Sequence, residues 1–192
     1  SVITSDGGVV MGKVIFINER VEINMDNIRF QVDSIIEEYT DGSLPIDPVV
    51  IAKKVGIPIS QVNFKSVKGS AVLGGIKKNK ENISIYINAN DSMARKRFTI
   101  AHELGHYFLN HINNKGEFVD LHRDVLAVKS KEEQEANEFA GCLLMPEKKL
   151  VEKFDQLRKL NFGTGIIEME LSRIFKVSQS AMNVRLKRLN LK

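Results

Sequence analysis

The sequence lacks the features that would place it in several common classes of protein. It has a single cysteine, Cys142, among 192 residues, so no disulfide can form within the chain. Cys142 stands in an apolar run and is predicted to be a buried, unreactive thiol. No apolar stretch approaches the ~20 residues that cross a bilayer, and residues 1–11 have neither the basic nor the apolar region of a signal peptide. These absences predict a cytoplasmic protein with no membrane partner.

An excess of charge of one sign is also missing from most of the chain. The sequence has 28 basic and 24 acidic residues, and its hydrophobic fraction of 43% is typical of a globular protein. A chain of this length can bury a core without disulfides or metals, so any metal site is expected to serve chemistry rather than folding. The exception is the segment from residue 171 to the end, which has six basic and no acidic residues. Its charge favours either a solvated basic face or an anionic partner.

Hydrophobic periodicity and turn residues predict helices around a small sheet. Gly74 and Gly75 suggest a bulge in one strand, and Asp91 is the predicted N-cap of a long helix. The predicted helices span residues 27–40, 48–55, 91–110, 130–145, 147–160, 166–175 and 178–190, and the predicted strands span residues 57–67, 71–77 and 83–88. Little pattern is visible between the 91–110 helix and residue 128. This order of elements predicts an α+β fold.

The motif that carries chemistry is His102-Glu103-Leu104-Gly105-His106. Residues four apart on a helix share a face, so both imidazoles can reach one metal ion. Glu103 projects to the edge of that face, where it can act as the general base that takes a proton from the attacking water. The motif is short enough to occur by chance in a helix that simply packs on a core, so it indicates a zinc site only together with a third ligand.

The third ligand is expected downstream, because catalytic zinc usually has three protein ligands. Glu133 is the main candidate, since it shares a helical face with the small residues Ala136 and Ala140, which would let the two helices approach closely. Asn137, one turn on, could accept a ring N–H from a liganding histidine. Glu133 is also the third position of a capping box that begins at Ser130. Glu135 is the runner-up ligand; it and Glu132 are predicted to be solvated.

The two motifs together resemble the ImmA/IrrE family of metallo-endopeptidases. The resemblance is carried by residues 97–106, Arg-Phe-Thr-Ile-Ala-His-Glu-Leu-Gly-His, and by residues 133–146, with Ala-Asn, Phe-Ala and Leu-Leu-Met-Pro. It covers roughly residues 25–146 and extends more loosely to the end. It implies a zincin-like, thermolysin-like helix pair on a small antiparallel or mixed sheet, with Zn²⁺ bound by His102, His106 and Glu133. It also implies an intracellular protease that cleaves a helix-turn-helix repressor in stress response or mobile-element induction.

The resemblance also suggests a division of the chain into three parts. Residues 1–24 are predicted to be an N-terminal extension or a segment foreign to the natural protein, residues 25–146 the zinc metallopeptidase domain, and residues 147–192 a C-terminal helical extension. The strand at 83–88 either pairs with an extended substrate or is an ordinary strand of the sheet. His111 and His122 are predicted to be surface or loop histidines, and no oxyanion stabiliser is assigned, although Tyr107 and His122 are nominees.

The segment from Leu171 to Leu186 resembles a helix-turn-helix, with Ser178 capping the second helix. In a DNA-binding interpretation, the second helix would present Gln179, Ser180 and Asn183 to a major groove. Its basic residues fall late in that helix, which favours a helical appendage that packs on the peptidase or receives its substrate. Nucleic acid is therefore not the expected partner. Two alternatives to the peptidase stay open: a binding module that acts without proteolysis, and a DNA-binding regulator that uses the basic C-terminal helices.

Overall fold

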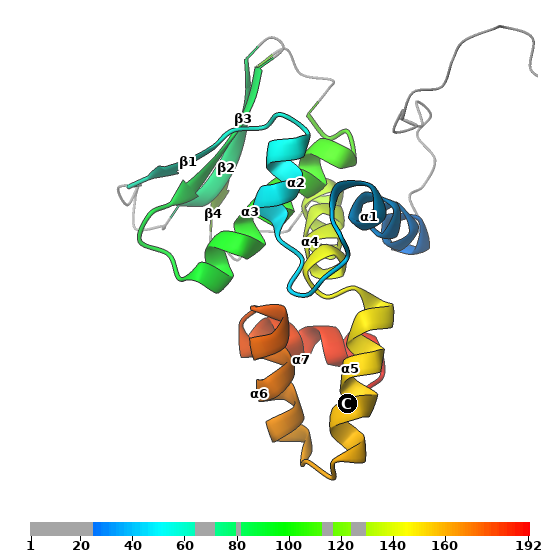
Figure 1. The fold of residues 1–192 in the computed structure, drawn as a ribbon. Coiled ribbons are helices and arrows are strands. Elements are labelled where there is room, and N and C mark those ends of the chain that lie inside the picture. Colours follow the sequence, from blue (N-terminus) through cyan, green and yellow to red (C-terminus); the bar gives the residue numbers. More distant parts are fainter. Residues whose placement is uncertain (1–24, 64–71, 80–81, 113–116, 124–129) are drawn as a thin grey trace, which may run out of the picture.

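The fold combines helices with a small mixed sheet (Figure 1). The structure is a computed structural model that describes residues 25–63, 72–79, 82–112, 117–123 and 130–192. In these residues the helices are α1 (Met25–Tyr39), α2 (Pro48–Lys54), α3 (Met93–Phe108), α4 (Lys131–Leu144), α5 (Glu147–Lys159), α6 (Thr164–Phe175) and α7 (Gln179–Arg188), and the strands are β1 (Ile59–Val62), β2 (Val72–Asn79), β3 (Asn82–Asn88) and β4 (Glu117–Arg123). The predicted α+β class is confirmed, and the predicted segment 1–24 lies outside the described residues. None of the described helices is long and apolar enough to cross a membrane.

The sheet has the strand order β1-β3-β2-β4, with β1 parallel to β3 and the other neighbours antiparallel. Ile85 pairs with Ile59 of β1 on one side and with Ile76 of β2 on the other. Over residues 85–87 both edges of β3 are occupied, which favours the interpretation of β3 as an ordinary strand of the sheet over one that pairs with substrate. The bulge predicted near Gly74 is confirmed as a register shift between Val72 and Gly74. Strand β4 was not predicted.

Helix α3 lies directly on this sheet. A Cβ atom at Gly74 would stand 2.3 Å from Thr99 Cγ2 and 2.7 Å from the Tyr86 carbonyl oxygen. Glycine is therefore what lets β2 approach α3 so closely. On the opposite side α3 packs against α4, where the ring of Phe108 stacks on Phe139 with 5.8 Å between centroids. The apolar residues Ile28, Val32, Ile35 and Ile36 of α1 are buried, and α1 packs on α4.

Helices α5, α6 and α7 lie together beyond the end of α4, away from the sheet (Figure 1). Two buried arginines connect them to the rest of the protein. Arg97 of α3 donates to the carbonyl oxygens of Ile46, at 2.6 Å, and of Lys176, at 3.3 Å. Arg185 of α7 donates to the Met145 carbonyl oxygen at 3.3 Å and to the Glu138 carboxylate at 3.1 Å. The C-terminal helices are thus held to the core by polar contacts made inside the protein.

Candidate metal centre

Helix α3 presents His102, Glu103 and His106 inside the protein. The helix begins with Ser92, whose hydroxyl accepts a hydrogen bond from the Arg95 N–H at 3.3 Å, so the prediction of Asp91 as the N-cap is wrong. One helical turn separates the two histidines, and their Nε2 atoms lie 3.1 Å apart. Both rings are buried, and both carboxylate oxygens of Glu103 are shielded from solvent. All three side chains are thus held on a helix that is packed on both sides.

Glu133 comes from the first turn of α4 and faces these histidines. Its carboxylate oxygens lie 3.4 Å from His102 Nε2 and 3.1 Å from His106 Nε2. Its backbone N–H donates to the Ser130 hydroxyl at 3.2 Å, so the helix cap uses the main chain of Glu133 and leaves its side chain for the histidines. The two interpretations of Glu133 as cap and as ligand are therefore compatible.

The three side chains offer a set of donors that fits a metal ion. His102, His106 and Glu133 are the group of potential ligands found among the described residues. Tetrahedral zinc with bonds of ~2.0–2.1 Å requires donors about 3.3 Å apart. The two Nε2 atoms lie 3.1 Å apart, close to that value, and they face different oxygens of the Glu133 carboxylate, at 3.1 and 3.4 Å. With one donor atom taken from each residue, the three lie within 4.8 Å of one another. Two imidazoles and one carboxylate are also the donor types that zinc accepts in catalytic sites.

Gly105 sets the distance between the two helices that carry the site. A Cβ atom at this position would lie 3.1 Å from Ala136 Cα, 3.2 Å from the Ala136 carbonyl oxygen and 3.2 Å from Phe139 Cβ. These neighbours belong to α4, and two of them are backbone atoms that cannot rotate away. The close approach places Glu133, less than one turn before Ala136, against the histidines.

We expect Gly105→Val to lower the free energy of unfolding by ~1–3 kcal/mol, because added methyl groups would overpack this contact. The same displacement of α4 should weaken metal binding by moving Glu133 away. Urea denaturation and competition with a chromophoric chelator measure the two effects. Gly141→Ala, in α4 but with nothing within 4 Å of its added Cβ, is the control and should stabilise by ~0.5–1 kcal/mol. Unchanged metal affinity in Gly105→Val would contradict this account of the helix contact.

The structure corrects the predictions for His111 and Glu135. His111 was expected at the surface or in a loop; it does lie in the turn after α3, but not at the surface, since its Nδ1 lies 3.0 Å from His106 Nδ1 and its Nε2 lies 3.1 Å from a Glu135 oxygen. Glu135 was expected in solvent, but it is buried. Its carboxylate reaches His111, whereas the carboxylate that lies against the two histidines of α3 is that of Glu133. Asn110 is the feature of the sequence that could have indicated this position of His111. Asparagine is suited to the left-handed conformation that turns the chain back at the end of a helix.

Two other residues considered from the sequence do not join this cluster. Asn137 is not brought into hydrogen-bond contact with either histidine of α3, and its buried Nδ2 has no hydrogen-bond partner. The ring of Tyr107 packs on Phe108, with 5.1 Å between centroids. The prediction for the side chain of His122 lies outside what the structure describes, since only its backbone, paired with Gly74 in the sheet, is described.

A hollow of about 490 Å³ lies beside the cluster, between α3, α4 and α7. Phe98 forms part of its wall, and the Phe98 ring lies 6.3 Å from the His102 ring between centroids. The wall is largely apolar, with Met145, Val177 and Val184, and it includes three arginines and no acidic residue.

The sequence is similar to known peptidases. It matches the peptidase M78 family, described as the IrrE N-terminal-like domain, over residues 52–187. It is also 30% identical over 125 residues to the metallopeptidase ImmA of Bacillus subtilis (strain 168), an alignment that covers 65% of this chain and 67% of that protein. The family match includes the histidine helix, α4 and most of the C-terminal helices.

Proposed function

Because this chain belongs to the ImmA/IrrE family of metallopeptidases, we propose that it is a zinc-dependent endopeptidase in which His102, His106 and Glu133 bind the metal. The observation that carries the proposal is the convergence of three donor atoms, one from each residue, that lie within 4.8 Å of one another, with the two histidine Nε2 atoms 3.1 Å apart and facing the Glu133 carboxylate. Helices α3 and α4, in contact at Gly105, would then be a zincin-like pair that supplies two ligands and one ligand respectively.

Glu103 is the proposed general base. When bound, zinc would act as a Lewis acid that polarises a peptide carbonyl. Glu103 takes a proton from the attacking water and returns it to the leaving amine. Its position next to His102 on the same helix fixes the carboxylate relative to the metal ligands, and its complete burial strengthens its electrostatic effect on the reacting groups.

The proposed substrate is a helix-turn-helix transcriptional repressor in the cytoplasm, cleaved at a specific peptide bond. This part rests on the family resemblance. The hollow bordered by Phe98, whose ring lies 6.3 Å from that of His102 between centroids, is the place proposed for a polypeptide segment that approaches the site. Cleavage of a repressor would relieve repression in a stress response or during induction of a mobile element.

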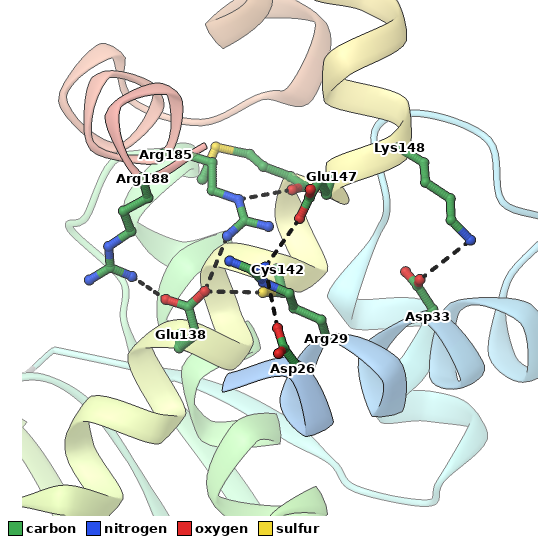
Figure 2. Close-up of polar contacts among 10 residues, drawn as sticks. Asp26, Arg29, Asp33, Glu138, Cys142, Glu147, Lys148, Arg185 and Arg188 are labelled. Atoms are coloured by element: carbon green, nitrogen blue, oxygen red, sulfur yellow. Dashed lines mark hydrogen bonds and ion pairs between the residues drawn. The ribbon is translucent and has the colours of Figure 1, made fainter. Parts of the chain in front are cut away.

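The DNA-binding alternative is less well supported by the C-terminal helices. Asn183, near the start of α7, donates to Glu168 at 2.8 Å and is therefore engaged within the protein. Arg185 and Arg188 both contact Glu138 (Figure 2). These residues would have to break internal contacts to reach DNA, which favours a role in packing the appendage on the peptidase.

The test of the proposed function is the zinc content of the purified protein, without chelator or added metal. We expect about one zinc per wild-type chain and loss of the metal in His102→Ala and in Glu133→Ala. Zinc retained by Glu133→Ala but lost by Glu135→Ala would move the third ligand to Glu135. A wild-type chain that neither contains nor binds zinc on titration would overturn the proposal.

A further inference from the structure

We propose that His111 and Glu135 form a hydrogen-bonded chain that fixes the tautomer and orientation of His106 for zinc binding. The inference rests on the proposed function, because it assigns new residues to the same metal site. His106 Nδ1 lies 3.0 Å from His111 Nδ1, and His111 Nε2 lies 3.1 Å from Glu135 Oε2. The chain thus runs from the ring nitrogen of His106 that points away from the site to a carboxylate on α4.

The backbone at the end of α3 brings His111 to this position. Asn110 adopts a left-handed conformation with φ of 62°, and its N–H donates to the Tyr107 carbonyl at 3.1 Å. The His111 N–H donates to the His106 carbonyl at 2.9 Å. This pair of bonds is a Schellman motif, which turns the chain back over the last turn of the helix. A histidine five residues after His106 would otherwise lie off its helical face.

The positions of the protons follow from the contacts. His106 directs Nε2 toward His102 and Glu133, so zinc binding at Nε2 leaves Nδ1 as the protonated nitrogen of a neutral ring. That N–H must donate to His111 Nδ1, which therefore accepts. A neutral His111 then carries its proton on Nε2 and donates to Glu135. Only this arrangement satisfies both short contacts at once.

The surroundings support a neutral His111 and an accepting Glu135. The side chains of His111 and Glu135 are only 7% and 9% exposed. Burial of this ring beside a second imidazole disfavours its charged form. Lys131 places its Nζ 3.8 Å from Oε1 of Glu135, which leaves Oε2 to accept from His111. Histidine ligands of zinc commonly donate their second N–H to a group held in this way.

The first experiment measures the zinc dissociation constant of the full chain by competition with a chromophoric chelator. His111→Leu removes the acceptor and should weaken zinc binding about tenfold or more. His111→Asn places an amide oxygen near the position of Nδ1 and should restore most of the affinity. Glu135→Gln keeps an acceptor without its charge and should give an intermediate loss. Wild-type affinity in His111→Leu would overturn the proposal, as would a loss that His111→Asn does not reduce.

A matched control separates positioning from general stability. Gln31 donates to the Phe108 carbonyl at 3.0 Å, at the same end of α3 but outside the chain of hydrogen bonds. Gln31→Leu should lower the free energy of unfolding without changing zinc affinity. If it weakens zinc binding as much as His111→Leu does, the effect of His111 is one of stability and the proposal fails.

A spectroscopic measurement tests the proton assignment directly. In long-range ¹H–¹⁵N spectra of the zinc-loaded wild-type protein, His111 should be protonated at Nε2 and His106 at Nδ1. The opposite tautomer of His111 would overturn the inference while leaving the zinc site intact. Failure of the wild-type chain to bind zinc would instead overturn the proposed function, so the two failures are distinguishable.

Discussion

Glu103→Gln is expected to abolish most peptidase activity while the protein keeps its zinc. General acid–base catalysis typically contributes 10²–10⁴-fold to a rate, so we expect a loss of about 10³-fold in kcat. The glutamine has the same shape as the buried glutamate but cannot take the proton from water. Because Glu103 is not one of the three proposed ligands, zinc content should stay at the wild-type value. Cleavage of a co-expressed helix-turn-helix repressor, followed by mass spectrometry, measures the loss.

The matched control for this variant is Glu132→Gln, which removes an exposed carboxylate from the first turn of α4. It should cleave at the wild-type rate. Wild-type cleavage by Glu103→Gln would exclude the general-base role. If the variant no longer cleaves the repressor but still relieves repression in cells, the binding-module alternative would be favoured. In that alternative the chain acts by binding its partner without proteolysis.

The sequence could predict most of the candidate site because its members lie on helices with clear periodicity. His102 and His106 are four residues apart, and this spacing alone places them on one face. Glu133 required a second inference, that the small residue Ala136 would let another helix come close. The structure places Gly105 and Ala136 against each other at that point. Two local patterns, one on each helix, were thus enough to predict that these three side chains lie together.

The residues that were missed depend on backbone turns and on tertiary contacts, which helical spacing does not describe. His111 reaches His106 only because Asn110 reverses the chain after α3. Glu135 was predicted to face solvent, but in the structure its carboxylate contacts the His111 ring. Strand β4 was missed because its pairing with β2 joins residues about 40 positions apart, such as Lys77 with Val119. Such long-range pairing leaves little trace in local sequence patterns.

The second large effect is expected at Glu138, where α4 meets α7 (Figure 2). Its carboxylate accepts from Arg185 at 3.1 Å, from Arg188 and from the Cys142 thiol at 3.4 Å. Burial raises the pKa of Cys142 to about 11, so the thiol stays protonated and can donate. The predicted burial of Cys142 is confirmed. Glu138 therefore joins α4 to α7 through its two contacts with arginines, and its third contact, with Cys142, lies within α4.

The contacts of Glu138 with Arg185 and with Arg188 are expected to differ in strength, because the two arginine side chains differ in their exposure to solvent. The Arg185 side chain is 3% exposed, whereas that of Arg188 is 54% exposed. Glu138→Leu leaves the Arg185 guanidinium buried without a counter-charge and should cost ~3–5 kcal/mol of unfolding free energy. Arg188→Met removes a pair that solvent screens and should cost ~0–1 kcal/mol. Arg188→Met is the control for the loss of a positive charge from α7 in Arg185→Met.

A double-mutant cycle decides whether the pair itself stabilises the protein. Arg185→Met should cost less than Glu138→Leu, about 1–3 kcal/mol, because Glu138 retains Arg188 and Cys142 as partners. In the double variant, apolar side chains replace both buried charges, and such replacements are often close to neutral. We therefore expect the double variant to be more stable than Glu138→Leu alone, measured by urea denaturation. Additive losses would mean that each residue stabilises the fold through other contacts, and that the ion pair is not what fixes α7 beside the metal-site helices.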